Sequence, residues 1–513
     1  MRDAIITIEN LQVCLHDKFN GRALIHNLSF QVFHGETIAI VGESGSGKSL
    51  TAKAIMQLLQ ANNFNCKGSV TLTKKDGHTV NLLSCNKKEL QSIRGNEMAM
   101  IFQEPMSSLN PLMRIGQQLT EAIYAHRQTN KLSAQQEALS WLEKVRIPFP
   151  KETLHKFPHQ LSGGQKQRVM IAMAMCNKPG LLIADEPTTA LDTLTQKEIL
   201  TLLSSLQKET GMGMIFISHD LGIVENIADK VMVMQNGKMV EYQKTQQLFT
   251  HPTHPYTQSL LACRPIHFKK GERIIIQSEK QIADSNSFEK ELIEETLNNA
   301  KNNTEVSAPI LNVEDLCIRF TNKKYFWKSR PTFFEAVKHV DLTIYKGETI
   351  GLVGESGCGK TTFARALLGL IQPSSGSIYF NGKSHIFPTK KEWKGSHREI
   401  QIVFQDPYSS LNPTLQIGKA IEEPLLTNKT FSKRKDAQEY VRELLKKVQL
   451  DPDHYSRYPH QFSGGQRQRI VIARALALQP DFIIWDESVS ALDVHIQAQI
   501  LNLLNDLKNT YQF

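Results

Sequence analysis

The sequence has few cysteines, no long apolar run and no signal-like start. Its seven cysteines are scattered over 513 residues without a Cys-x-x-Cys pair: Cys14, Cys66, Cys85, Cys176, Cys263, Cys317 and Cys358. This spacing favours free thiols in a reducing compartment, and we expect neither a zinc nor an iron–sulfur site, since the usual clustering of ligands is missing. No apolar run approaches the roughly 18 residues that a membrane-spanning helix needs. The start, MRDAIITIEN, carries acidic residues and alternates like a strand, so it does not resemble a signal peptide.

The chain also lacks a strong charge excess. Lys and Arg number 60 against 51 Asp and Glu, a net charge of +9, which fits a polyanionic ligand such as a nucleotide without requiring nucleic acid. Hydrophobic residues make up 40% and charged residues 22%, which excludes a mostly disordered or fibrous protein. At roughly 100–200 residues per domain, the length predicts about three to five folding units.

What the sequence does contain is an internal duplication. GETIAIVGESGSGKS (35–49) returns as GETIGLVGESGCGKT (347–361), and IFQEPMSSLNP (101–111) as VFQDPYSSLNP (403–413). PHQLSGGQKQR (158–168) returns as PHQFSGGQRQR (459–469), and LLIADEPTTALD (181–192) as FIIWDESVSALD (482–493). Four motif pairs in one order predict a tandem of two related domains, because the period is far longer than that of a solenoid.

We place the first domain at 1–265, a polar linker at 266–308 and the second domain at 309–513. Each copy is predicted to be α/β: IAIVG, IGLVG, LLIAD, MIFIS and FIIWD are apolar enough for strands buried on both faces. Apolar residues at helical spacing in 115–145 and 417–448 predict a helical subdomain inserted between the strands of each copy.

The pattern GxxxxGK[ST] after a strand is a P-loop, whose backbone N–H groups turn inward around phosphate oxygens. Lys48 and Lys360 would reach the β- and γ-phosphates, and Ser49 and Thr361 would offer hydroxyls to Mg²⁺. The predicted ATP-binding residues are Gly42, Glu43, Ser44, Gly45, Ser46, Gly47, Lys48 and Ser49 in the first copy, and Gly354, Glu355, Ser356, Gly357, Cys358, Gly359, Lys360 and Thr361 in the second.

Each copy ends a later apolar strand with an Asp-Glu pair, the Walker B pattern. Asp185 and Asp486 would hold Mg²⁺, and Glu186 and Glu487 would polarise the attacking water. Both aspartates lie 23 residues after the serine of an SGGQ motif, which supports the same assignment in both copies.

The SGGQ motifs are the most specific signal, since a serine and two glycines before a helix form a further anion-binding N-terminus. They comprise Ser162, Gly163, Gly164 and Gln165 in the first copy, and Ser463, Gly464, Gly465 and Gln466 in the second. With the P-loops and Walker B strands, they make nearly the whole chain resemble the ATP-binding cassette (ABC) family. The resemblance implies an intramolecular head-to-tail dimer that holds ATP between the P-loop of one domain and the SGGQ signature of the other.

Further roles follow from the resemblance. Gln103 and Gln405 match the glutamine that contacts the metal and the attacking water and senses a membrane partner, and His219 matches the switch histidine at the γ-phosphate. Phe19, 29 residues before Lys48, is a candidate for stacking on adenine, although core packing explains it nearly as well.

The two FQ motifs and HPTHPYTQSLL (251–261) resemble ATPases of oligopeptide, dipeptide and nickel importers. The fusion of two ATPases most resembles microcin C-type peptide importers, and glutathione importers are a close alternative. We therefore expect ATP and Mg²⁺, two permease subunits, a periplasmic peptide-binding protein and a place on the cytoplasmic face of the bacterial inner membrane. Only Cys263 lies near HPYT, so we expect no iron–sulfur cluster, and a ribosome-bound tandem ABC protein is the competing class.

The second copy departs from the pattern. Ser488 stands where the first copy has Pro187, and a histidine equivalent to His219 would fall at position 520, beyond the last residue, Phe513. We expect a truncated second domain, destabilised by unpaired strand edges, whose ATP site binds nucleotide but hydrolyses it slowly.

Overall fold

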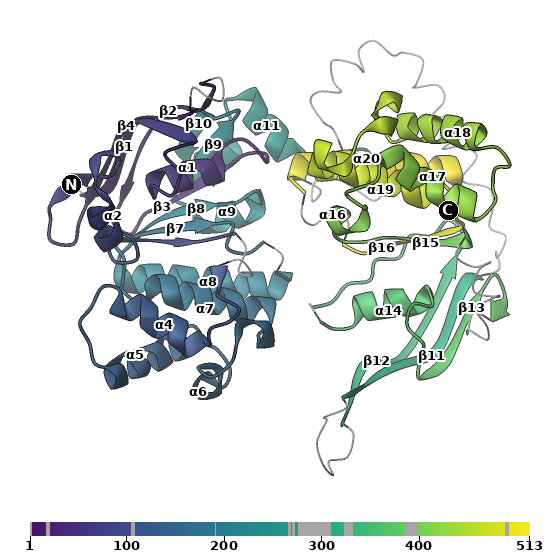
Figure 1. The fold of residues 1–513 in the computed structure, drawn as a ribbon, viewed down its shortest axis with the longest axis horizontal. Helices are drawn as coiled ribbons and strands as arrows, with labels where there is room; N and C mark the ends of the chain where they lie inside the picture. The colour runs from purple at the N-terminus through teal and green to yellow at the C-terminus, as the bar shows by residue number, and fades with distance from the viewer. Residues whose placement is uncertain are drawn as a thin grey trace. The chain divides into compact units, whose positions relative to one another are not determined.

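The computed structural model describes residues 3–16, 21–103, 108–189, 191–264, 268, 272–274, 309–322, 332–355, 357–384, 398–487 and 492–513. The chain divides into two compact units, Met1–Arg264 and Pro265–Phe513 (Figure 1). Most of the predicted linker lies outside the described residues, as do Phe19 and Ser356.

The described residues of the first unit form two sheets. Its antiparallel sheet has the order β2-β1-β4-β5, from β1 (Ala4–Leu15), β2 (Ala23–Phe33), β4 (Phe64–Thr73) and β5 (Thr79–Asn81). Its six-stranded sheet has the order β10-β9-β3-β8-β7-β6, from β3 (Thr37–Val41), β6 (Met98–Ile101), β7 (Leu181–Asp185), β8 (Gly213–Ile217), β9 (Lys230–Gln235) and β10 (Lys238–Lys244). Strands β6, β7, β8, β3 and β9 run parallel, and β10 returns antiparallel to β9.

Helices cover both faces of this larger sheet (Figure 1). The helices of the first unit are α1 (Lys48–Ile55), α2 (Lys87–Ile93), α4 (Ile115–Tyr124), α5 (Lys131–Lys144), α6 (Pro150–Thr153), α7 (Gly163–Met175), α8 (Thr193–Thr210), α9 (Leu221–Ile227), α10 (Thr245–Thr250) and α11 (Pro255–Ala262). One core joins α4, α5, α7 and α8 to one sheet face, and a second joins β1, β2, β4 and α1 to the other.

Every residue of β3, β7 and β8 is buried, as the apolar runs predict. Alternate residues serve the two cores: Ile38 and Ile40 face the antiparallel sheet, and Ala39 and Val41 face the helical side. A parallel strand buried on both faces needs an unbroken apolar run, which explains these sequences.

The second unit repeats part of this arrangement. Its antiparallel sheet has the order β12-β11-β13-β14, from β11 (Pro309–Asn322), β12 (Thr332–Tyr345), β13 (Ser375–Phe380) and β14 (Lys383–Ser384). Two parallel strands come next, β15 (Ile400–Val403) and β16 (Phe482–Trp485). Its helices are α14 (Lys360–Leu367), α16 (Pro407–Ser410), α17 (Ile417–Thr427), α18 (Arg434–Lys447), α19 (Gly464–Leu476) and α20 (Val494–Tyr511). The helical subdomain predicted in each copy is therefore present as α4–α5 and α17–α18.

One strand prediction for the second copy is wrong, and for a second strand only the expected full burial is wrong. IGLVG (350–354) is not a strand, and its apolar side chains are exposed, with Val353 at 90%. FIIWD forms β16, but its residues are only half-buried. The reason is the lack of neighbours: in the first unit β3 pairs with β8 and β9, and the described part of the second unit contains no strand equivalent to either.

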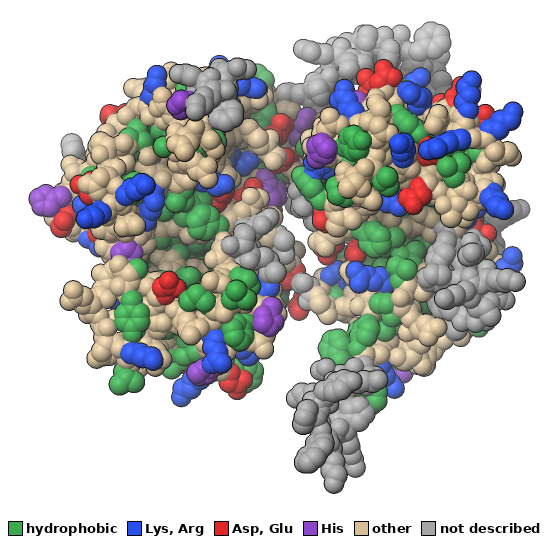
Figure 2. Space-filling model, viewed as in Figure 1, with side chains coloured by type: hydrophobic (Ala, Val, Ile, Leu, Met, Phe, Trp, Pro, Cys, Tyr) green, Lys and Arg blue, Asp and Glu red, His purple; other side chains and the backbone are tan. Residues whose placement is uncertain are grey.

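None of the helices in the described part of the chain combines the length and the hydrophobicity that crossing a membrane requires. On the face seen in Figure 2, Lys and Arg side chains are interspersed with acidic and uncharged ones on both units, so the positive net charge does not form a surface of one sign there.

Candidate active site

The P-loop of the first unit follows the buried strand β3 and leads into α1. Gly42, Gly45 and Gly47 have φ of 148°, 81° and 105°, a region that other residues rarely adopt. Space is also limiting, because a Cβ on Gly42 would lie 2.2 Å from the carbonyl oxygen of Met234. The loop therefore needs glycine at these positions, and it brings backbone N–H groups to the start of α1.

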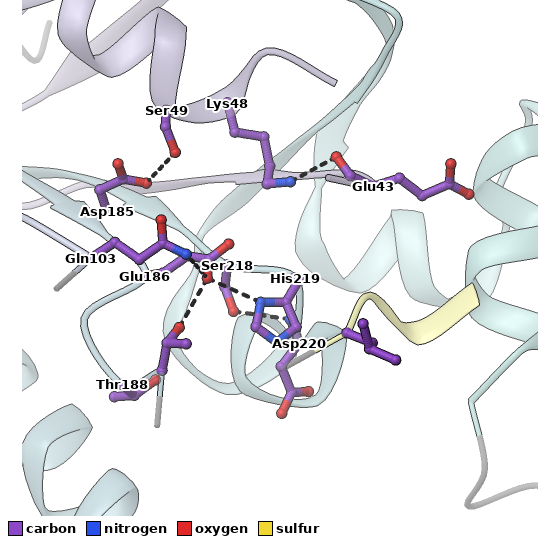
Figure 3. Close-up of polar contacts among 12 residues, drawn as sticks. Glu43, Lys48, Ser49, Gln103, Asp185, Glu186, Thr188, Ser218, His219 and Asp220 are labelled. Atoms are coloured by element: carbon purple, nitrogen blue, oxygen red, sulfur yellow. Dashed lines mark hydrogen bonds and ion pairs between the residues drawn. The ribbon is translucent and has the colours of Figure 1, made fainter. Parts of the chain in front are cut away.

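Lys48 is the first residue of α1 and is buried. Its Nζ donates hydrogen bonds to the carbonyl oxygens of Gly42 (2.7 Å) and Glu43 (2.9 Å), so the ammonium group spans the loop (Figure 3). The hydroxyl of Ser46 is buried without a hydrogen-bond partner among the described residues. A cation and an unsatisfied hydroxyl within a glycine loop suit a phosphate ligand.

The next residue, Ser49, connects the P-loop to the Walker B strand. Its Oγ donates a 2.9 Å hydrogen bond to Oδ1 of Asp185, the last residue of β7. Asp185 is 3% exposed, and this burial raises the pKa of its carboxyl group, as does the nearby charge of Glu186, while the Ser49 hydrogen bond opposes the rise. A hydroxyl and a buried carboxylate side by side are the oxygen ligands that Mg²⁺ favours.

Glu186 is the convergence point of the site. It has a φ of 47°, an unusual conformation for a residue other than glycine, asparagine or aspartate. Its Oε2 accepts hydrogen bonds from Gln103 Nε2 (3.0 Å) and Thr189 Oγ1 (2.9 Å) and lies 3.3 Å from His219 Nδ1. Figure 3 shows Gln103 and His219 pointing toward Glu186. Residues from three separated segments therefore meet at one carboxylate.

The contacts of Glu186 determine the protonation state of its carboxyl group. Burial alone would raise the pKa of Glu186, but the hydrogen bond and the charge of His219, with the hydrogen bond from Thr189, outweigh burial and leave the pKa below its ordinary value. Glu186 is thus ionised at neutral pH, the state that a group needs in order to accept a proton from water.

Each signature serine caps a helix. Ser162 Oγ accepts from Gln165 N–H at 3.3 Å, and Gln165 Oε1 accepts from Ser162 N–H at 3.1 Å. Ser463 and Gln466 form the same capping box at the start of α19. The first turns of both helices are thereby fixed in the same conformation.

The two glycines of the signature have different roles. A Cβ on Gly164 would lie 2.6 Å from Thr195 Cγ2, and one on Gly465 would lie 2.6 Å from Ile496 Cγ2, so the second glycine is needed for helix packing. A Cβ on Gly163 or Gly464 would meet only ordinary contacts, at 3.7 and 3.6 Å. Packing within each unit therefore does not explain the first glycine, whereas close approach of a ligand would.

The P-loop and Walker B residues of the second unit form the same hydrogen bonds but are more exposed to solvent. Lys360 Nζ donates to the carbonyl oxygens of Gly354 (2.6 Å) and Glu355 (2.8 Å), and Thr361 Oγ1 to Asp486 Oδ1 (3.2 Å). Gln405 Nε2 donates to Glu487 Oε2 at 2.8 Å, and Glu487 repeats the φ of 47°.

The two sites differ in the solvent exposure of their acidic residues. Glu487 is exposed and Asp486 half-buried, whereas Asp185 is buried and Glu186 half-buried. No described residue of the second unit occupies the position of His219. The remaining loop residues Gly357, Cys358 and Gly359 complete the second P-loop, with Gly359 at a φ of 105°.

Sequence reasoning missed two contributors. Thr189, in the turn after Glu186, donates a hydrogen bond to the Glu186 carboxylate. Tyr256, from the HPYT segment, accepts a 3.1 Å hydrogen bond from the Glu43 N–H in the P-loop. The HPYT segment is itself held by buried Glu241, which accepts from the backbone of Thr253 and His254.

Comparison with known proteins agrees with this geometry. The family model for ABC transporters matches residues 25–189 and 337–490. The chain belongs to the ABC transporter family. It is 43% identical over 511 residues to the glutathione import ATP-binding protein GsiA of Pectobacterium atrosepticum, and 45% identical over 514 residues to GsiA of Escherichia coli. In both cases the match covers 99% of this chain and 81% of the relative.

A solved dimeric bacterial ABC transporter cassette is also similar, at 27% identity and a TM-score of 0.41, covering 47% of this chain and 98% of that one. The family and the relatives identify the protein as an ABC ATPase of the importer branch, which binds and hydrolyses ATP.

The buried Asp185 should cost the nucleotide-free protein stability. The pKa of Asp185 is raised in the folded state, so its ionised form is less favourable in the folded protein than in the unfolded chain. This cost to the free energy of unfolding is present at neutral pH, and it fades as the pH falls through the folded-state pKa. Asp185→Asn keeps an acceptor for Ser49 and should raise the unfolding temperature of the nucleotide-free protein by a few degrees at pH 7, while Mg²⁺-dependent ATP binding is lost. Asp486→Asn, at the half-buried equivalent, is the matched control and should change the unfolding temperature less; an unchanged or lower value for Asp185→Asn would contradict this argument.

The contact of Tyr256 with the P-loop should contribute to nucleotide affinity. Tyr256→Phe removes one acceptor and should weaken ATP binding about two- to tenfold, the range expected for one hydrogen bond. Titration with a fluorescent ATP analogue measures this, with Tyr124→Phe, at an exposed tyrosine, as control. Identical affinities in the wild type and in Tyr256→Phe would show that this hydrogen bond does not contribute to nucleotide binding.

Proposed function

We propose that the protein powers import of small peptides, with glutathione as the first candidate substrate, from the cytoplasmic face of a bacterial inner membrane. The observation that carries this proposal is the similarity over 99% of the chain to proteins named as glutathione import ATPases. The microcin C-type substrate suggested by the tandem arrangement is the second candidate, since HPYT and both FQ motifs are shared by peptide importers.

In the proposed mechanism the two units close around ATP. Lys48 and the P-loop N–H groups bind the phosphates, while Ser49 and Asp185, already paired at 2.9 Å, would hold Mg²⁺. Glu186 accepts a proton from the attacking water, Gln103 orients that water, and His219 contacts the γ-phosphate. Ser463–Gln466 of the second unit would complete this site, and the room beside Gly464 supports a ligand there.

The second site would take its P-loop from the second unit and Ser162–Gln165 from the first. Its Glu487 is exposed, whereas Glu186 is half-buried. Slow hydrolysis there is the expected consequence, because exposed groups act in a medium of high dielectric constant, where electrostatic stabilisation of the transition state is weaker.

A groove in the second unit supports a membrane partner. It has a volume of about 750 Å³ and is lined by, among others, Phe404, Gln405, Glu423 and Arg474. Gln405 also donates to Glu487, so a segment seated in this groove would contact a residue that touches the catalytic carboxylate. We infer that two permease subunits dock on the two units, and that a periplasmic binding protein delivers the substrate to them.

Uptake by cells tests the proposal. A strain lacking this chain should accumulate much less labelled glutathione or small peptide than its parent, and the wild-type chain should restore uptake. Glu186→Gln should fail to restore it, since it keeps the phosphate contacts but loses the proton acceptor, whereas Glu487→Gln should restore most of it. Normal uptake of glutathione and small peptides by the deletion strain would refute the proposed function.

A further inference from the structure

Strands β11 and β12 carry two facing irregularities. The register between them shifts on both sides of Leu316, and Asp315 and His339 have φ of 46° and 45°. The first unit has the same feature between β1 and β2, with Asn10 and Asn27 at φ of 49° and 46°. The bulges thus belong to the architecture of both copies, and their side chains can be compared directly.

At this place the two copies carry different chemistry. In the first copy the residues are Asn10, Gln12, Asn27 and Ser29; aligning NVEDLCIRF with TIENLQVCL and VKHVDLTIY with IHNLSFQVF gives Asp315, Cys317, His339 and Asp341 in the second. Amides and a hydroxyl are thus replaced by two carboxylates, a thiol and an imidazole. All four replacements are residue types that bind metal ions.

The geometry brings three of these side chains together. One potential ligand atom each of Asp315, Cys317 and His339 lies within 4.8 Å of the others. His339 Nδ1 is 2.6 Å from Asp315 Oδ1, and the His339 N–H lies 3.3 Å from Cys317 Sγ and donates to it. The sulfur therefore faces the bulge that carries the histidine.

The burial of the three groups suits a bound ion. Cys317 is 2% exposed and fixed, whereas the Asp315 and His339 side chains are 67% and 70% exposed and free to adjust. Ligand atoms about 2.0–2.3 Å from a tetrahedral Zn²⁺ lie roughly 3.3–3.8 Å apart, a range that small rotations of the two exposed side chains would reach.

Neighbouring groups support the same ligands. The backbone N–H of His339 donates to Cys317 Sγ and so holds the sulfur in place at the bulge. Asp341 accepts a 2.7 Å hydrogen bond from the Asp315 N–H, which holds the bulge and adds a negative charge beside the cluster.

We propose that Asp315, Cys317 and His339 form a site for one thiophilic divalent cation, with Zn²⁺ as the best match and its fourth position open to water. The ion would link β11 to β12 at the bulges, where the first copy has hydrogen bonds from Gln12 to Asn27 and from the Asn10 N–H to Ser29. Residues 315, 317 and 339 do not form a Cys-x-x-Cys pattern. The proposed zinc site therefore differs from the expectation, based on sequence, of no zinc site.

Metal titration of the full chain tests the site, with Zn²⁺ measured by calorimetry and Co²⁺ by absorption. The wild type should bind one Zn²⁺ at this site, and Co²⁺ should give a thiolate-to-metal charge-transfer band. Cys317→Ser should abolish the band, and His339→Asn and Asp315→Asn should each weaken Zn²⁺ binding at least about tenfold. The two asparagine variants copy residues that the first unit holds in the same bulge, so folding should be preserved.

Cys66→Ser is the control. Burial raises the pKa of the Cys66 thiol, as does the nearby Cys14, and two neighbouring thiols are a rival place for a soft metal. The control should keep both the Zn²⁺ affinity and the Co²⁺ band. Three outcomes would overturn the proposal: no Zn²⁺ binding by the wild type, unchanged binding in all three site variants, or loss of binding in Cys66→Ser alone.

Discussion

The pairing of strand β3 between β8 and β9 is the interaction on which the first active site depends. It buries all five residues of β3 and so fixes the point at which the P-loop leaves the sheet. Because β7 pairs with β8 in the same direction, its end places Asp185 and Glu186 at the same edge of the sheet, next to Lys48 and Ser49. His219 follows β8 and reaches the same edge. Parallel strands thus convert four distant sequence segments into one site.

The second unit shows the effect of losing that pairing. Its P-loop has the same glycine angles and the same lysine contacts, so the local sequence is sufficient for the loop itself. The segment before the loop, 350–354, however, forms no strand and is exposed, and Glu487 is open to solvent. The loop is therefore a local property of the sequence, whereas burial of the Walker B carboxylates is a property of the whole sheet.

Much of this could be predicted from sequence because the motifs encode local geometry. The P-loop glycines and the SGGQ caps occupy the conformations that their residue types favour. The strands of the first unit were predictable because burial on both faces requires continuous apolar runs. The same reasoning is wrong for 350–354, because an apolar run in the sequence does not reveal whether neighbouring strands are present to pair with it. Tyr256, Thr189 and the Asp315–Cys317–His339 cluster were missed because tertiary contacts, rather than spacing along the chain, bring them into place.

Our central proposal is that the productive site would combine the P-loop of the first unit with the signature of the second. Its most direct test is steady-state ATP turnover of two matched variants of the full chain, Ser463→Arg and Ser162→Arg, which alter the same helix-capping serine in the two copies. We expect at least about a tenfold loss of turnover for Ser463→Arg and retention of most turnover in Ser162→Arg. Equal losses in the two variants, or a larger loss in Ser162→Arg, would contradict it.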